Sequence, residues 1–214
     1  MDRRTFLRLA AAGSAVSLTG ILPGVAEAEG LSPELITRAR AGLKSAIARF
    51  TQVRTVGLLA TDVKSQGTMT VVTPDRLRWE LAAPDAVTYW IGPEGIAYRT
   101  EKGVVKAGKE AAGRFGAVLT DLLVFLGGDL AKLEARYAVR IPSREKDGAL
   151  NLIAEPRTDE VKKLVRAVRV QTTPELWSVR RVEIEEAGGD KTVLDFGPAQ
   201  RDPKIDPATM RPPG

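Results

Sequence analysis

The chain has 214 residues, of which 43% are hydrophobic and 28% charged, with a formal net charge of +5; these values suit one folded domain with a sizeable core. It contains no cysteine and no histidine, which excludes structural disulfides, a lipid-modified cysteine, Cys/His zinc sites and His-based catalytic triads. Acidic and basic residues are interspersed without a basic stripe, so we expect no nucleic-acid partner.

The first 28 residues are predicted to be a cleaved export signal. An arginine pair at positions 3 and 4 precedes an apolar run from Leu9 to Leu22 and an Ala-x-Ala sequence at 26–28. The paired arginines favour the twin-arginine route. An uncleaved anchor is the alternative, but the run is shorter than the roughly 20 residues of a membrane span. We expect cleavage near Ala28 and a single periplasmic domain over residues 29–214.

A helix is predicted to begin at Ser32-Pro33-Glu34, because serine can cap it, proline is tolerated in its first turn and glutamate suits its positive end. Apolar residues recur at three- and four-residue spacing as far as Phe50, which predicts that the helix continues to that point. The first strand is then expected to start within Phe50–Val53, with Gln52 on the sheet surface.

A β-hairpin is predicted over Gly67–Pro84. Alternating side chains indicate strands at Gly67–Val72 and Arg76–Leu81, joined by a turn at Thr73–Asp75. Leu77, Trp79 and Leu81 would share an apolar face. Ordinary sheet core and the wall of a ligand site are both open interpretations of that face.

The hairpin is followed by a meander with strands at Ala86–Ile91, Ile96–Arg99 and Val104–Lys106. Residues 103–109, GVVKAGK, match most of the sequence motif of a phosphate-binding P-loop. Glu110 stands where a hydroxyl should hold magnesium, and the pattern indicates a strand and a turn, so nucleotide binding is rejected.

Residues Phe115–Leu126 are apolar almost all round and predict an enclosed helix. Its length of about 18 Å at about 1.5 Å per residue is too short to cross a bilayer. It would either pack on the sheet as plain core or act as a lid over a cavity. Gly127-Gly128 ends it, and Asp129 can cap a short helix at Leu130–Glu134.

A second meander completes the predicted sheet, with strands at Ala135–Ile141, Ala149–Ala154, Val168–Thr172, Trp177–Glu185 and Lys191–Phe196. Thr158–Val165 is either a helical turn or a polar connection. Glu183 and Glu185 are interpreted as a solvated strand surface and not as a catalytic pair. After Gln200 a proline-rich tail, from about residue 201, is expected to be extended or loosely attached.

These elements predict a mainly β (α+β) fold, with a strongly curved antiparallel sheet forming an open half-barrel and helices covering its concave face. An apolar space between sheet and helix could hold a ligand. No catalytic residue, cofactor or metal site is predicted.

The order of several motifs resembles the LolA-like periplasmic outer-membrane lipoprotein carriers. Phe50-Thr51-Gln52 is followed by a glycine-led strand, by Pro74-Asp75-Arg76-Leu77-Arg78-Trp79-Glu80 and by Pro84. The resemblance implies a carrier that receives acylated lipoproteins from an inner-membrane ABC-type releasing complex and passes them to an outer-membrane acceptor. Thr73 departs from the family's lid-holding arginine, a role that could pass to Arg78, and Met210 replaces an expected aromatic residue.

From the pattern and this resemblance we expect the ligand-binding site to be lined by Met69, Val71, Leu77, Trp79, Leu81, Trp90, Phe115, Leu119, Leu122, Leu123 and Leu126. The protein is expected to be a soluble monomer that shelters acyl chains, and Trp79→Glu is expected to abolish binding while leaving the fold largely intact. Two alternatives stay open: a carrier of another lipid, such as a glycolipid or polyisoprenoid, and a module that senses lipid or lipoprotein.

Overall fold

A computed structural model describes residues 31–57, 61–107, 113–127 and 130–213. Within these ranges, the side chains of residues 107, 113–118, 127, 130 and 131 are not described. The predicted export signal at 1–28 and the proposed cap at Asp129 therefore lie outside the described residues.

A 12-stranded antiparallel sheet dominates the fold, which confirms the mainly β prediction. The sheet order is β6-β5-β4-β3-β2-β1-β11-β10-β9-β8-β7, and β12 pairs with β1. The first half consists of β1 (Ser45–Val56), β2 (Thr61–Val72), β3 (Arg76–Leu81), β4 (Thr88–Gly92), β5 (Gly95–Thr100) and β6 (Gly103–Ala107). The second half consists of β7 (Tyr137–Arg144), β8 (Leu150–Pro156), β9 (Val165–Thr172), β10 (Val179–Glu186), β11 (Lys191–Phe196) and β12 (Gln200–Arg201).

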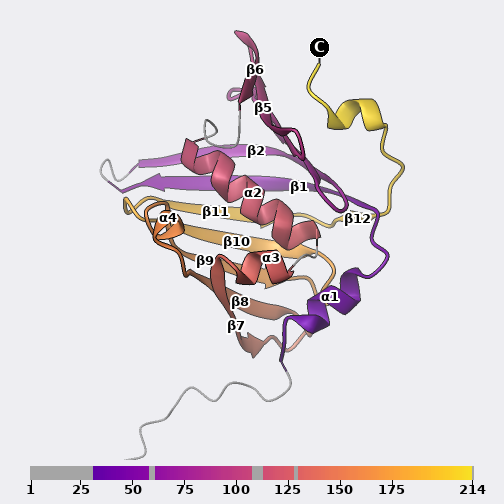
Figure 1. The fold of residues 1–214 in the computed structure, drawn as a ribbon, viewed down its shortest axis with the longest axis vertical. Coiled ribbons are helices and arrows are strands. Elements are labelled where there is room, and N and C mark those ends of the chain that lie inside the picture. The colour runs from indigo at the N-terminus through magenta and orange to yellow at the C-terminus, as the bar shows by residue number, and fades with distance from the viewer. Residues whose placement is uncertain (1–30, 58–60, 108–112, 128–129, 214) are drawn as a thin grey trace, which may run out of the picture.

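Helices α2 (Gly113–Gly127) and α3 (Leu130–Glu134) connect the two edges of this sheet. The chain leaves the sheet at β6, one edge strand, and returns at β7, the other. The connection must therefore cross a face of the sheet, and Figure 1 shows α2 lying over the central strands. Within the described residues, no helix has the length and apolarity that a membrane crossing needs.

One face of the sheet is mainly apolar, and we call it the helix face. Cross-strand pairs place Phe50 opposite Phe196, Met69 opposite Trp79, and Leu77 opposite Ile91. These residues form one hydrophobic cluster with the buried leucines of α2. The cluster explains why α2 is apolar almost all round, since it is enclosed as the sequence predicts.

The N-terminal helix is shorter than predicted. Helix α1 spans Glu34–Arg40, and the chain turns at Gly42, whose φ of +75° favours glycine. From Ser45 onward the chain is a strand paired with β2 along its whole length, with β12 at Ala46 and Ile47 and with β11 from Phe50. The apolar residues before Phe50 thus satisfy a two-residue period on the helix face, and the predicted helical period there was wrong.

The C-terminal segment is fastened to the sheet, which corrects the expected loose attachment. Asp202 accepts hydrogen bonds from the backbone N–H groups of Lys44 (2.6 Å) and Ser45 (3.2 Å). A 3-10 helix, η1 (Pro207–Met210), follows, and Met210 is buried. Of the two interpretations of Thr158–Val165, the helical turn is correct: α4 (Asp159–Lys162) begins with Thr158, whose side chain accepts a bond from the Val161 N–H.

Candidate ligand-binding site beneath helix α2

A small apolar cavity lies between α2 and α3 and the second half of the sheet. The helices contribute Asp121, Leu122, Phe125 and Leu133; the strands contribute Tyr137, Val139, Leu152, Ala154, Val168, Val170, Val182 and Ile184. Its free volume of about 40 Å³ is far below the range of about 300–1,000 Å³ that is usual for small-molecule sites. The cavity is therefore nearly filled by side chains in this conformation.

The predicted hairpin residues lie on the helix face but line no part of this cavity. Met69, Val71, Leu77 and Trp79 are buried, and Leu81 packs at the edge of the same cluster. Among the predicted helix residues, Leu119, Leu122, Leu123 and Leu126 are also buried, and only Leu122 reaches the cavity. Phe115 belongs to the part of α2 whose side chains the structure does not describe.

Trp79 lies at the centre of an aromatic cluster, and its side chain offers no surface that is open to a ligand. Its ring stacks on Phe50 with centroids 4.0 Å apart, and Phe196 meets it edge-on at 6.2 Å. Trp79 is 0% exposed, so a glutamate there would bury a charge inside the core. Trp79→Glu would disrupt the fold itself, which corrects the expectation that it leaves the fold intact.

Two predicted site residues point to the opposite face of the sheet. Trp90 pairs with Arg78 on β3 and with Ala97 on β5, and these positions alternate with the helix-face residues. Arg78 forms an ion pair with Glu80 of its own strand at 2.5 Å. Arg78 therefore does not hold α2, and Trp90 does not line the space beneath it.

The arginine that holds the end of α2 is Arg40, the last residue of α1, which was not among the predicted site residues. Its Nη1 donates to the carbonyl of Phe125 in the last turn of α2, and its Nε donates to the carbonyl of Trp177 at 3.1 Å. Its guanidinium also lies 4.5 Å from the centre of the Phe125 ring. A cation suits the negative end of a helix, and the bond satisfies a carbonyl that α2 cannot pair internally.

Arg40 is only 5% exposed and forms no ion pair with a described carboxylate. Burial lowers the pKa of Arg40 to about 9, because the charged guanidinium loses its water. One of its nitrogens, Nη2, also lacks a hydrogen-bond partner among the described groups. The contact holds α2 at a cost in desolvation, so opening of α2 would return a buried charge to water.

Thr73 stands at the position where the LolA-like carriers are expected to have an arginine. It fastens the segment that follows Arg40, between α1 and β1. Its Oγ1 donates to the carbonyls of Leu43 (2.6 Å) and Lys44 (3.2 Å). The backbone N–H of Thr73 also donates to the carbonyl of Lys44 at 3.0 Å. Thr73 thus anchors the segment between α1 and β1 to the β2–β3 turn.

A second polar contact joins the middle of α2 to β7. The Tyr137 hydroxyl donates to Oδ2 of Asp121 at 2.6 Å, and Nε of Arg136 lies 3.1 Å from Oδ1. Burial raises the pKa of Asp121 above its usual value, although the bond from Tyr137 and the charge of Arg136 act in the opposite direction. Burial and the neighbouring Asp121 likewise raise the pKa of Tyr137.

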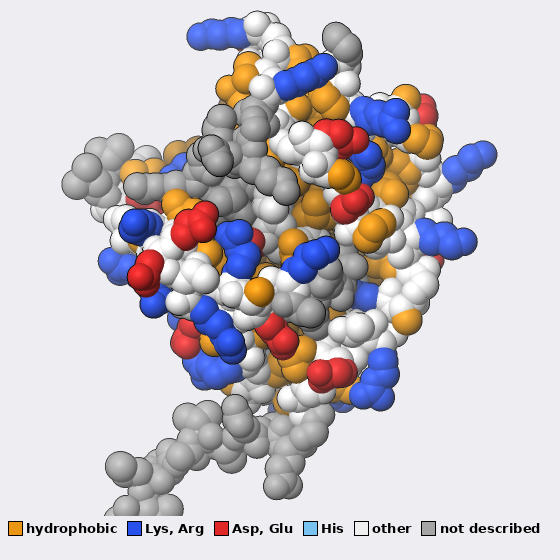
Figure 2. Space-filling model, in the orientation of Figure 1, with side chains coloured by type: hydrophobic (Ala, Val, Ile, Leu, Met, Phe, Trp, Pro, Cys, Tyr) orange, Lys and Arg blue, Asp and Glu red, His pale blue; other side chains and the backbone are white. Residues whose placement is uncertain are grey.

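The cavity can enclose an apolar group, but its chemistry is limited to these polar contacts. Within the described ranges, no three acidic side chains are grouped closely enough to hold a metal ion. Figure 2 shows basic and acidic side chains interspersed over the face that carries α2, with hydrophobic side chains between them. Gln52, expected on the sheet surface, is instead buried on the helix face.

The comparisons with known proteins are ones of fold. No family model and no curated protein matches the sequence. An uncharacterized conserved protein from Thermus thermophilus has a TM-score of 0.52 at 10% identity, covering 84% of this chain and 93% of its own. A LolA superfamily protein from Nitrosomonas europaea has a TM-score of 0.45 at 9% identity, with coverages of 83% and 94%.

A chain of the Pseudomonas aeruginosa MucA/MucB complex has a TM-score of 0.46 at 12% identity, covering 84% of this chain and 60% of that one. At 9–12% identity these three similarities concern the fold alone.

Proposed function

We propose that the protein is a periplasmic carrier that shelters the acyl chains of lipoproteins between the helix face and α2, and releases them after α2 moves. The observation that carries the proposal is an apolar helix held across an apolar sheet by a few polar contacts near its middle and end. Sequence order, through the LolA-like resemblance, supports lipoproteins as the cargo. The sheet is then a curved layer whose concave side faces the cargo.

Acyl chains require α2 to move, because the closed cavity of about 40 Å³ cannot hold one. A chain of roughly 14 methylenes gains about 11 kcal/mol on leaving water, at about 0.8 kcal/mol for each CH₂. Opening α2 breaks three polar contacts: the bond from Arg40 to the Phe125 carbonyl and the two contacts of Asp121. At about 1.5–3 kcal/mol for each charge-assisted contact, this costs about 5–9 kcal/mol.

The two energies are therefore of similar size, which suits a carrier that must both load and unload. One acyl chain roughly offsets the broken contacts, and further chains would exceed them. A partner that binds the open form can then reverse the balance with a modest difference in affinity. If the polar contacts held α2 much more strongly, the cavity would exclude cargo. If these contacts were missing, α2 would stay open and expose apolar surface.

The test is mass spectrometry of protein purified from the periplasm without detergent. We expect acyl-bearing material to accompany the protein, with lipoproteins distinguished from glycolipids and polyisoprenoids by mass. Val168→Gln should reduce the bound material at least about fivefold, because it places an amide in the apolar cavity at a cost of about 1–3 kcal/mol.

The matched control is Val193→Gln. Val193 is a half-buried valine on β11 and lies on the face opposite α2. This change should leave the bound material unchanged. Protein that is free of acyl material, and that also fails to release lipoprotein from inner-membrane vesicles with their releasing complex, would overturn the proposal.

A further inference from the structure

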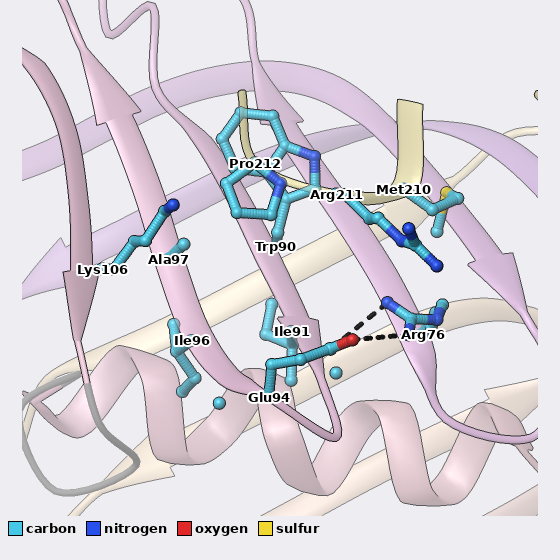
Figure 3. Close-up of a pocket in the computed structure, with 12 residues that line it drawn as sticks. Arg76, Trp90, Ile91, Glu94, Ile96, Ala97, Lys106, Met210, Arg211 and Pro212 are labelled. Atoms are coloured by element: carbon cyan, nitrogen blue, oxygen red, sulfur yellow. Dashed lines mark hydrogen bonds and ion pairs between the residues drawn. The ribbon is translucent and has the colours of Figure 1, made fainter. Parts of the chain in front are cut away.

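A cleft of about 420 Å³ lies between the C-terminal segment and the sheet face that points away from α2 (Figure 3). We call it the tail cleft. Trp90 and Ala97 form its floor, and Met210, Arg211 and Pro212 lie along the opposite side. Its volume falls in the range of about 300–1,000 Å³ that is usual for small-molecule sites. No part of the tail cleft is shared with the cavity beneath α2.

The floor of the tail cleft is rigid and apolar. Trp90 is 5% exposed, and its Nε1 donates to the carbonyl of Thr209 at 3.0 Å, which ties the C-terminal segment to β4. Ala97, beside it on β5, is small enough to leave space above the sheet. Buried Met210 packs at the same place. The cleft is therefore a preformed gap between two fixed walls.

Positive charge predominates around this apolar floor. Arg76 binds Glu94 through two hydrogen bonds, of 2.7 and 3.3 Å. These bonds lower the pKa of Glu94, and the charge of Arg211 adds to the effect. Figure 3 shows the guanidinium of Arg211 beside that of Arg76, which alone is bonded to Glu94, while Lys106 lies on the other side of the cleft.

Lys106 and Arg211 form no ion pair within the described part of the chain. The lining thus carries three cations and one anion, next to an aromatic ring and aliphatic carbon. A neutral apolar ligand would cover these cations without replacing their water, whereas an oxyanion would make charge-assisted bonds to them.

We infer that the tail cleft binds an amphipathic organic anion, with its carboxylate or phosphate group at Arg211 and Arg76 and its apolar body on Trp90 and Ala97. The inference is independent of the proposed carrier function, because the two sites share no lining residue. It assigns a role to the C-terminal segment, which provides one apolar wall of the cleft and the guanidinium group of Arg211.

The indole N–H signals of the three tryptophans in a ¹H–¹⁵N NMR spectrum test this inference, with Trp90→Phe to assign the signal of Trp90. The probes are octyl phosphate, octanoate, n-octanol and inorganic phosphate. We expect octyl phosphate and octanoate to shift the Trp90 signal saturably. n-Octanol and inorganic phosphate should each bind this site at least tenfold more weakly.

Arg211→Gln should weaken the binding of octyl phosphate at the Trp90 signal at least fivefold. The matched control, Lys204→Gln, removes a cation of the same terminal segment outside the cleft and should have no effect. An equal response to n-octanol, or an unchanged affinity in Arg211→Gln, would overturn the inference. So would a full response to inorganic phosphate alone, or a shift confined to Trp79, which would place the amphiphile beneath α2.

Discussion

Replacing Tyr137 by phenylalanine deletes the hydroxyl that joins β7 to α2. The hydrogen bond to Asp121 measures 2.6 Å and is made by a neutral donor to a buried carboxylate. Bonds to charged groups contribute about 1.5–3 kcal/mol, so we expect the closed position of α2 to lose about 2 kcal/mol. Since about 1.4 kcal/mol corresponds to a factor of ten, the open population should rise about 30-fold.

Hydrogen exchange measures this change directly. The amides of α2 should exchange about 30-fold faster in Tyr137→Phe under conditions where exchange follows local opening, while the amides of β1 and β2 should change much less. If acyl chains bind only the open form, a larger open fraction lowers the apparent dissociation constant by the same factor. A fluorescent fatty acid should therefore bind more tightly, by up to about 30-fold.

Tyr98→Phe is the matched control, because Tyr98 is a half-buried tyrosine on β5, outside the contact between α2 and β7. It should leave both exchange and affinity unchanged. Exchange of α2 that stays at the wild-type rate in Tyr137→Phe would show that the Tyr137–Asp121 contact does not hold α2. Faster exchange with weaker fatty-acid binding would refute the link between opening and loading.

Three further predictions concern the contacts around α2 and the sheet beneath it. Arg40→Met removes the bond to the Phe125 carbonyl at the end of α2 and should speed exchange of its last amides by about five- to 150-fold, from about 1–3 kcal/mol for an unpaired carbonyl, whereas exposed Arg38→Met should not. Because burial raises the pKa of Asp121 in the folded state, the contribution of Asp121 to stability should be highest below its unfolded pKa and be lost as pH rises through the folded value. Glu183 and Asp202 have lowered pKa values and act in the opposite direction, so the test is the unfolding free energy of the wild type minus that of Asp121→Asn, measured in urea between pH 3 and 7, which should fall as pH rises. Gly67→Ala should destabilise the fold by more than about 3 kcal/mol in thermal unfolding, because its Cβ would lie 1.9 Å from a backbone oxygen of β3. Gly197→Ala, whose Cβ would lie 3.7 Å from a backbone oxygen of β1, should cost under about 1 kcal/mol.

The strands could be predicted where the side chains alternate and a turn follows. The turn at Thr73–Asp75, the second hairpin strand and the three-stranded meander after it are found within about two residues of their predicted bounds. The N-terminal part of β2, Thr61–Gln66, was not predicted, because its side chains are mostly exposed on both faces and give no apolar alternation. Helix α1 was overextended because alanines in the following strand also fit a helical spacing.

The site was harder to predict, because it depends on which parts of a uniformly apolar face remain unfilled. Trp79 and the cavity strands carry the same alternation, yet aromatic rings fill the first region and smaller side chains such as Ala154 and Val168 leave space in the second. Arg40 offered no local signal, since its helical spacing alone does not reveal that the end of α2 covers it. Its partner carbonyl is 85 residues away in the chain.

Photo-crosslinking with a diazirine-bearing fatty acid tests the central claim most directly, because it reports where the acyl chain lies. The account predicts that labelled peptides come from α2 and from the helix face of β8, β9 and β10, including Leu152, Val168 and Ile184, and that unlabelled fatty acid competes with the labelling. Labelling confined to the outer face of the sheet, or labelling that unlabelled fatty acid does not reduce, would contradict the claim that α2 opens to admit acyl chains.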